Sequence, residues 1–228
     1  MSNEKKMNDV AETKPLSKSA MRRQRERELR YQTILSAAES LFAKEGYHNT
    51  SMERIADAAE VSVGAVYFYF KNKEDLLACL IDESGYCLRS VLGKAFLEAT
   101  PDLEGFKKAG HAFFEDYCLN HSDKLAILFR ESVGQSKIVE ERRKNASERL
   151  IKDVRNALEK VCEGMNYEFK SNLASEIIAV SILGIYERVA YQYIFWQGNT
   201  DGLKAIGHDA VDFLIGGIKN LFREKECT

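Results

Sequence analysis

Proline is nearly absent from this 228-residue chain, and that scarcity constrains the fold more than any other feature. The two prolines, Pro15 and Pro101, leave long stretches with no strong helix breaker. Proline inside a helix removes a hydrogen bond and clashes with the preceding turn, so long proline-free stretches favour helices. Alanine, leucine, glutamate, lysine and arginine also outnumber the β-branched residues, which is typical of helices. The sequence therefore predicts an all-α protein of about nine helices.

Composition is that of a cytoplasmic globular protein. Hydrophobic residues make up 45% of the chain and charged residues 30%, which allows a substantial core. Five cysteines, an odd number without a C-x-x-C pair, indicate a reducing compartment and no zinc or redox motif. The longest apolar run, residues 177–186, is shorter than the roughly 20 residues that cross a bilayer, so no membrane partner is expected.

Residues 31–77 show the pattern of a helix-turn-helix. Apolar residues at helical spacing in residues 31–45 predict a first helix that ends at Gly46. Thr50 stands three residues before Glu53, the spacing of a capping box, and predicts a short second helix. Ser62 is the expected N-cap of a third helix that runs to about residue 70, and Asn72 is the expected N-cap of a fourth. Two short helices behind a longer one indicate DNA binding.

The third predicted helix carries four successive aromatic residues, 67–70, which point in four directions because a helix turns about 100° per residue. Val66 and Phe70 lie one turn apart and are expected in the core. Tyr67 and Phe68 lie on another face, which nothing in a small domain would cover. In a major groove, Tyr67 could donate a hydrogen bond to phosphate or a base edge, and Phe68 could touch thymine methyl groups.

Basic residues near the N-terminus indicate a polyanionic partner for one end of the molecule. Residues 17–30 hold six basic and two acidic residues, although the whole chain has a net charge of −2. Arg22 and Arg23 in this segment either reach the DNA or extend the first helix through ion pairs. Lys73, at the start of the fourth helix, is unfavourable for the helix dipole and is expected to bind a phosphate together with the free amides there. Thr50 is expected to offer its hydroxyl to a second phosphate.

Residues 34–77 resemble the DNA-binding domain of the tetracycline-repressor (TetR) family. The resemblance rests on Ala37-Ala38, Leu41-Phe42, Gly46-Tyr47, Thr50, Ile55-Ala56, Val61-Ser62, Gly64, Tyr67, Tyr69-Phe70, Lys73 and Leu76. It implies phosphate contacts by Thr50, Tyr67, Tyr69 and Lys73, and groove contacts by Val63, Gly64, Ala65 and Phe68. Two residues depart from the family pattern: Glu60 stands where the turn often has glycine, and Val63 stands where a polar groove residue is frequent.

The rest of the chain is predicted to be a larger helical domain. The expected division is a basic arm in residues 1–29, a DNA-binding domain in residues 30–76, and an effector-binding and dimerisation domain in residues 77–228. Helices are predicted to begin at Thr100-Pro101, at Ser122 or Asp123, and at Ser136, the last ending at Gly164, with two more near residues 172–197 and 203–222.

Small residues in the last two helices indicate close helix contacts, because each glycine inside a helix costs about 1 kcal/mol relative to alanine. A four-helix homodimer interface would explain them; packing within one chain is the alternative. The expected interface residues are Gly184, Arg188, Tyr191, Gly207, Ala210, Leu214 and Gly217.

Aromatic residues in this domain could line a pocket for a small hydrophobic or aromatic effector, although aromatics at helical spacing are more often core. The candidate lining residues are Phe113, Tyr117, Phe129 and Tyr186. The polar group around His111 and Glu115 lacks any metal or catalytic motif and is interpreted as solvated surface, so no enzyme activity, metal or cofactor is expected.

The sequence therefore predicts a homodimeric transcriptional repressor that a ligand releases from a pseudo-palindromic operator of double-stranded DNA. The alternative is a DNA-bound scaffold whose larger domain recruits a protein partner. Release of DNA by a small molecule would favour the first, and a co-purifying partner without such release would favour the second.

Overall fold

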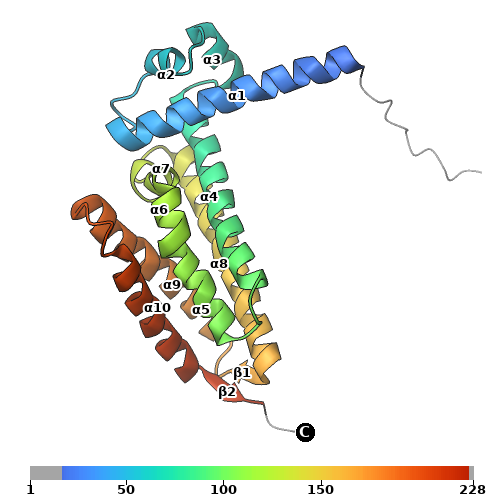
Figure 1. Ribbon diagram of the computed structural model, residues 1–228, viewed down its shortest axis with the longest axis vertical. Helices are drawn as coiled ribbons and strands as arrows, with labels where there is room; N and C mark the ends of the chain where they lie inside the picture. Colours follow the sequence, from blue (N-terminus) through green and yellow to red (C-terminus); the bar gives the residue numbers. More distant parts are fainter. Residues whose placement is uncertain (1–16, 226–228) are drawn as a thin grey trace, which may run out of the picture.

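The first three helices lie together at one end of the molecule, and a fourth leads from them into the larger part (Figure 1). The computed structural model describes residues 17–225. The small end consists of α1 (Lys18–Glu45), α2 (Met52–Ala58) and α3 (Val63–Tyr69), followed by α4 (Lys73–Leu97). Leu76 and Leu77, near the start of α4, are fully buried. Because α4 contacts α1 at the small end and also α5 and α8, it connects the two parts of the molecule.

Short polar side chains cap all four of these helices. Ser62 Oγ accepts a hydrogen bond from the Ala65 amide (3.2 Å), and Asn72 Oδ1 accepts one from the Asp75 amide (2.8 Å). Both N-caps are confirmed. The predicted cap of the second helix is wrong, because Ser51 is the N-cap of α2 and Thr50 precedes it. Both Ser and Thr are favourable caps, with Ser somewhat preferred, and the capping-box spacing from Thr50 to Glu53 pointed to the wrong one of the two neighbours.

Helix α1 is longer than predicted and begins at Lys18, with Ser17 as its N-cap, rather than at Tyr31. Its N-terminal end projects past α3 into solvent (Figure 1). Charged side chains here form pairs one turn apart, such as Arg22 with Glu26 at 2.8 Å, and these favour a helix without core packing. Residues 1–16 of the predicted basic arm lie outside the described residues.

The larger part is a bundle of antiparallel helices that includes three π-helical turns. Its elements are α5 (Leu103–Ala112), η1 (Phe113–Tyr117), α6 (Cys118–Asn120), α7 (Ser122–Ala126), η2 (Ile127–Glu131), α8 (Lys137–Met165), α9 (Ala174–Ala190), η3 (Tyr191–Trp196) and α10 (Leu203–Asn220). Helix α4 packs on α5 and α8, and α9 and α10 pack on each other along the opposite side (Figure 1). The predicted all-α fold is confirmed.

Two predicted helix boundaries shift. Helix α5 begins after Asp102, whose carboxylate accepts the Gly105 amide, rather than at Thr100-Pro101. Helix α8 continues through Gly164 to Met165, and its C-cap, Asn166, takes the left-handed conformation with φ 58°. Gly164 is needed for another reason: a Cβ there would lie 2.6 Å from the carbonyl oxygen of Pro101.

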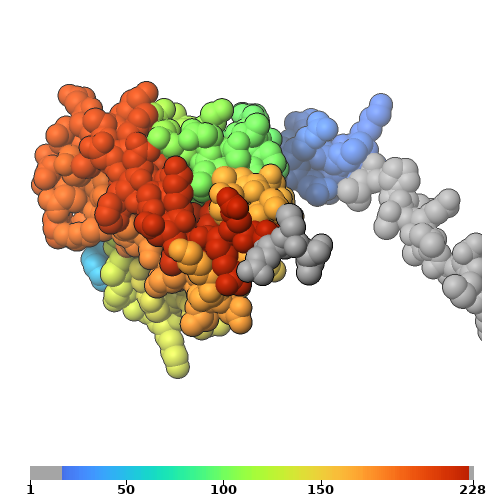
Figure 2. Space-filling model, turned by 90° about the horizontal axis from the view of Figure 1, so that it is seen from below, coloured from blue at the N-terminus to red at the C-terminus, as the bar shows by residue number. Residues whose placement is uncertain are grey.

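A two-stranded antiparallel sheet, not predicted from the sequence, closes the far end of the bundle. Strand β1 (Tyr167–Phe169) pairs with β2 (Phe222–Glu224), with Tyr167 opposite Glu224. Figure 2 views the molecule from this end: α10 lies across the larger part in red, and the blue N-terminal end of α1 protrudes at the side. The two strands tie the end of α10 to the end of α8.

Candidate nucleic-acid interface and ligand cavity

The outer face of α3 carries exposed aromatic rings. Val66 is fully buried, whereas Tyr67 is 50% exposed and Phe68 is 68% exposed. The predicted division of this helix into a buried stripe and an uncovered aromatic stripe is confirmed. Helix α3 contains no charged residue, and two neighbouring exposed rings on such a helix indicate a surface that another molecule covers.

Gly64 lies near these rings and is also exposed. No atom of the described residues lies within 4 Å of the place that a Cβ would occupy there. The fold therefore does not require glycine at this position, whereas close approach by a partner would. Val63 and Ala65 are half-buried, and Val63 packs against the core. Among the predicted groove residues, Gly64 and Phe68 are thus the more exposed.

Helix α1 supplies basic side chains beside α3. The half-buried Tyr69 donates its hydroxyl hydrogen to the backbone oxygen of Arg27 (3.3 Å), and its ring lies edge-on to Tyr31. The guanidinium of Arg27 stands 5.3 Å from the ring centroid of Phe68. Arg22 and Arg23 lie further along the exposed end of the same helix. The helical interpretation of this basic segment is therefore confirmed for residues 18–29.

The predicted phosphate contact by the Thr50 hydroxyl is contradicted by its position. Thr50 is 1% exposed, and its hydroxyl donates to the backbone oxygen of Gly46 (3.0 Å). This hydrogen bond closes the loop between α1 and α2, so the side chain faces the protein rather than solvent.

Lys73 also faces the protein, against the prediction. Its ammonium donates to the backbone oxygens of Tyr47 (2.7 Å) and Thr50 (2.8 Å), with His48 at 3.5 Å, and lies 4.4 Å from the Tyr47 ring centroid. Burial lowers the pKa of Lys73 from its ordinary value. A lysine at a helix start therefore has a structural explanation here: it binds the carbonyl groups of the loop before α2.

The turn between α2 and α3 contains a non-glycine residue in the left-handed region. Glu60 has a φ of 53°, which costs free energy for a residue with a Cβ. The residue that departs from the family pattern therefore keeps a positive φ despite its Cβ. The turn keeps the required geometry without the glycine.

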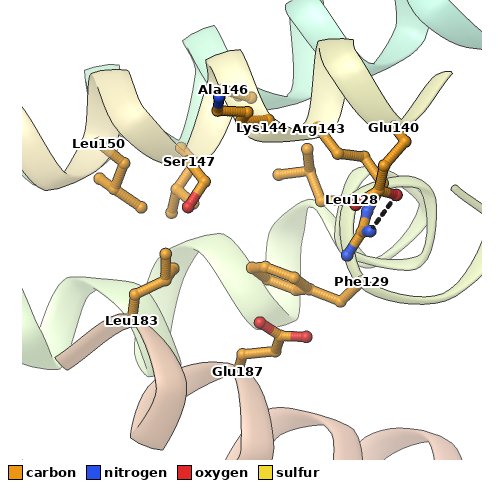
Figure 3. A pocket seen from close by; sticks show the side chains of 12 residues that line it. Leu128, Phe129, Glu140, Arg143, Lys144, Ala146, Ser147, Leu150, Leu183 and Glu187 are labelled. Carbon is orange, nitrogen blue, oxygen red and sulfur yellow. Dashed lines mark hydrogen bonds and ion pairs between the residues drawn. The ribbon is translucent and has the colours of Figure 1, made fainter. Parts of the chain in front are cut away.

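Two cavities lie side by side in the larger part, between α8 and the helices around it. The first, about 300 Å³, is lined from α4, η2, α8 and α9 (Figure 3). The second, about 320 Å³, is more apolar and is lined from α4, α5, α8 and α9. Leu150 borders both cavities. Together they form an apolar space with polar groups at the first cavity, as is typical of small-molecule sites.

The predicted pocket residues divide into two groups. Phe129 lines the first cavity and Tyr186 lines the second. Phe113 and Tyr117 line neither cavity; they are 2% and 0% exposed and stack on each other in the core. Their assignment to the pocket is wrong, because aromatic spacing does not distinguish a cavity wall from a filled core.

The first cavity contains charged groups that the sequence reasoning missed. Arg143 Nη1 donates to Glu140 Oε2 (2.7 Å), while Arg143 Nε is buried without a hydrogen-bond partner among the described residues. Across the cavity, burial raises the pKa of the Glu187 carboxyl, and the charge of Arg143 partly opposes this (Figure 3). Arg143 and Glu187 therefore place two opposite charges at the wall of an otherwise largely apolar cavity, as is frequent at functional sites.

The predicted dimer residues do not share one face. Gly184, Arg188 and Gly217 are exposed and Tyr191 is half-buried, as an interface requires. In contrast, Gly207, Ala210 and Leu214 are buried inside the subunit. A Cβ at Gly207 would lie 2.4 Å from the Phe114 ring. These three assignments are wrong, and for them the alternative of packing within one chain holds.

The exposed faces of α9 and α10 carry large apolar residues instead. Ile177 is 55% exposed and Val180 45% on α9, and Phe213 is 74% exposed on α10. The segment Ala174–Trp196 is long and apolar enough to cross a membrane by length and composition alone, although such a segment is also found in soluble proteins. The apolar run of residues 177–186, which is too short by itself to cross a bilayer, is only part of this longer segment.

The polar group around His111 packs against α10. The rings of His111 and His208 stack with centroids 3.9 Å apart, and His208 Nε2 contacts Glu115 Oε1. No cluster in the described part of the chain has the side chains to hold a metal ion. Burial lowers the pKa of His111. The stacking of His111 on His208 is a contact between helices that the sequence did not predict.

A short helix with exposed rings, preceded by a tight turn and a second short helix and flanked by basic side chains, defines a helix-turn-helix protein. Residues 34–80 match the family model described as "Bacterial regulatory proteins, tetR family". Residues 34–80 therefore form a DNA-binding domain of the tetR type, and the chain is similar to DNA-binding transcriptional regulators of that family.

Similarity extends beyond the DNA-binding part. The "Fatty acid metabolism regulator protein" of Bacillus subtilis (strain 168) is 27% identical over 198 residues, which cover 84% of this chain and 96% of that protein. The solved structure of the fatty acid degradation regulator FadR from Bacillus halodurans has a TM-score of 0.72 and 26% identity, and covers 82% of this chain and 95% of its own. FadR from Bacillus subtilis, solved in complex with stearoyl-CoA, shares the fold with a TM-score of 0.70 at 21% identity, covering 82% and 98%.

Proposed function

We propose that this regulator is a cytoplasmic repressor that a fatty-acyl compound releases from a pseudo-palindromic operator. DNA binding by α3 is supported by its exposed stripe, where Tyr67, Phe68 and the uncovered Gly64 lie beside the basic end of α1. In the major groove, Phe68 can contact thymine methyl groups and Tyr67 can donate to phosphate. Arg22 and Arg23 then contact the phosphates next to the groove.

The effector class follows from the shape of the cavities together with the relatives. Two adjoining apolar cavities that share Leu150 suit a long aliphatic chain. Arg143 and Glu187 place charged groups at one end, where the guanidinium of Arg143 could donate to a carbonyl oxygen of the ligand. The relatives named for fatty acid metabolism and fatty acid degradation favour an acyl chain over an aromatic compound.

A homodimer explains the apolar outer faces of α9 and α10. Exposed residues on α9 follow a helical stripe from Ile177 through Gly184 to Arg188, and Phe213 and Gly217 are exposed on α10. A second copy covering both helices would form a four-helix interface and remove these apolar groups from water. A membrane would cover only apolar side chains, whereas this stripe also contains charged Arg188.

Dimerisation places two copies of α3 on one duplex, in successive major grooves roughly 34 to 36 Å apart. A ligand that binds better to a dimer with another separation would shift the population toward the form that does not fit the operator. By linkage, operator DNA would weaken ligand binding by the same factor.

The DNA-reading assignment can be tested with duplexes selected from a random library by the purified protein. Phe68→Ala should lower affinity for the selected duplex at least tenfold and leave the melting temperature unchanged, because this ring is mostly exposed. Tyr86→Ala is the matched control, since Tyr86 is 72% exposed on α4. Equal affinities of the Phe68→Ala variant and the control would refute the assignment.

The effector assignment is tested by adding stearoyl-CoA, stearate or coenzyme A to the complex with the selected duplex. Stearoyl-CoA or stearate should release the DNA, and coenzyme A alone should not. Leu150→Trp, which fills the junction of the cavities, should abolish release, whereas Leu173→Trp at an exposed position should preserve it. Absence of release by every acyl compound, with a co-purifying protein, would favour the scaffold alternative.

A further inference from the structure

The π-helical turn η2 lies between the first cavity and the DNA-binding part. Three successive residues of this turn face different structures: Phe129 lines the cavity, whereas Arg130 and Glu131 contact the end of α1 and the loop after it. A π-helical turn contains an extra residue within a helix and is frequent at functional sites. Here it brings a cavity wall and two charged side chains together within one turn.

Glu131 is a nearly buried carboxylate that holds the loop between α1 and α2. Its side chain is 10% exposed, and its Oε2 accepts a hydrogen bond from the backbone amide of Tyr47 (2.7 Å). The other oxygen, Oε1, pairs with Arg130 Nε at 2.5 Å. A carboxylate taken out of water needs such partners, and both its charge and its acceptor capacity are used by this contact.

Arg130 holds the adjacent end of α1. Its guanidinium donates to the backbone oxygen of Ala43, in the last turn of that helix, where a cation is favourable. The same group lies 4.7 Å from the ring centroid of Phe195, on η3. Arg130 therefore contacts α1 on one side and the end of the α9–η3 segment on the other, and this segment also contributes Glu187 to the first cavity.

The loop held by Glu131 is also the loop held by Lys73. Tyr47 donates its amide hydrogen to Glu131, and its carbonyl oxygen accepts from Lys73 (2.7 Å). This loop leads into α2, and α2 packs on α3. A shift of the loop would therefore change the orientation of the exposed rings on α3 relative to the larger part.

We propose that Arg130 and Glu131 are positioning residues that couple the cavity to the DNA-reading helix, an inference that rests on the proposed function. A ligand in the first cavity displaces Phe129, and the two residues that follow it in the same turn move with it. Glu131 then leaves the Tyr47 amide, and the loop before α2 is released from the larger part. The differential contact between the two states is this hydrogen bond and the Arg130 contact with Ala43.

The first test compares operator affinity with and without saturating stearoyl-CoA. The ratio of the two dissociation constants measures coupling, which is about 5- to 150-fold in typical allosteric proteins. Glu131→Ala should reduce this ratio to below about threefold, while stearoyl-CoA alone, measured by calorimetry, binds the variant at least as tightly as the natural protein, because the ligand no longer has to break this hydrogen bond. If Glu131 only stabilised the fold, its replacement would leave the ratio of the two operator dissociation constants unchanged.

Lys124→Gln provides the matched control. Lys124 on α7 pairs with Glu39 on α1 at 2.5 Å and so also links the two parts, but it does not line the cavity. This variant should retain the coupling of the natural protein. Glu131→Gln is the conservative variant: its amide oxygen can still accept from Tyr47, so its coupling should lie between those of Glu131→Ala and the natural protein. Full coupling in the folded Glu131→Ala variant would overturn the proposal.

A second test needs no ligand. Leu183→Trp places a large side chain in the first cavity, near Phe129 (Figure 3). It should lower operator affinity at least tenfold in the natural background and less than threefold in the Glu131→Ala background. Equal losses in both backgrounds would refute coupling through Glu131. If stearoyl-CoA fails to release the natural protein but this cycle gives the expected result, the acyl effector is wrong and the coupling stands.

Discussion

Replacing Lys73 with methionine distinguishes a structural lysine from one that binds phosphate. Methionine keeps an unbranched apolar stem and removes only the ammonium. In the structure this ammonium donates to the backbone oxygens of Tyr47 and Thr50 at 2.7 and 2.8 Å and lies against the Tyr47 ring. The variant therefore loses two short charge-assisted hydrogen bonds and a cation–π contact.

The expected loss of stability follows from these contacts. Hydrogen bonds to charged groups contribute about 1.5 to 3 kcal/mol each, and an exposed cation–π pair adds about 0.5 to 1 kcal/mol. Lys73 is half-buried, so water can replace part of this interaction. A net loss of about 2 to 3 kcal/mol is expected, which corresponds to a melting temperature lower by about 4 to 12 °C in a chain of this size.

Calorimetric melting and the salt dependence of operator binding together test this reasoning. Lys71→Met, at an exposed neighbouring position, is the control and should melt like the natural protein. If Lys73 instead binds phosphate, the Lys73→Met variant should melt normally, and the slope of log affinity against log salt should fall by about 0.9. An unchanged melting temperature with that reduced slope would refute the structural role.

Three further variants test other contacts. Glu60→Gly should increase the free energy of unfolding in urea by about 0.5 to 1 kcal/mol, because Glu60 has a φ of 53°; a decrease would show that the turn is not strained. Gly64→Ala should leave the stability equal or slightly higher, since a Cβ there meets no described atom within 4 Å. The same variant should bind the operator at least tenfold more weakly, as measured by fluorescence anisotropy. Unchanged affinity would argue against close contact of Gly64 with the groove. Burial lowers the pKa of His111, so its stabilising effect is complete above the unfolded value of about 6.5 and is lost as pH falls toward the folded value. In the His111→Gln variant the melting temperature should therefore fall less steeply as pH drops below about 6.5, and an unchanged pH dependence would refute this.

Local sequence patterns were sufficient for the helix-turn-helix. Ser62 and Asn72 begin α3 and α4 as predicted, and Val66 and Phe70 are buried while Tyr67 and Phe68 are exposed. A cap is decided within one helical turn, and the buried face of a helix follows from its 3.6-residue period. These features depend on residues that are close in sequence.

The small residues of α10 show where such patterns stop. Gly207 and Gly217 are both predicted for the dimer interface, but at about 100° per residue ten positions leave them about 80° apart around the helix. Gly207 packs on Phe114 inside the subunit, whereas Gly217 is exposed. Periodicity gives the angle between two residues but does not say which of two adjacent faces meets the core.

The sequence by itself determined the helical class, the caps of α3 and α4, the exposed aromatic stripe of α3 and the resemblance to the tetR family, because each depends on residues that are close together in the chain. Only the tertiary structure decided that Lys73 and Thr50 face inward, that Phe129 borders a cavity while Tyr117 fills the core, and that Glu131 holds the Tyr47 amide. The partners in these contacts lie far apart in the chain: Tyr47 and Glu131 are 84 residues apart. Contacts between residues far apart in sequence depend on how whole helices pack together. The sequence around one residue does not determine that packing.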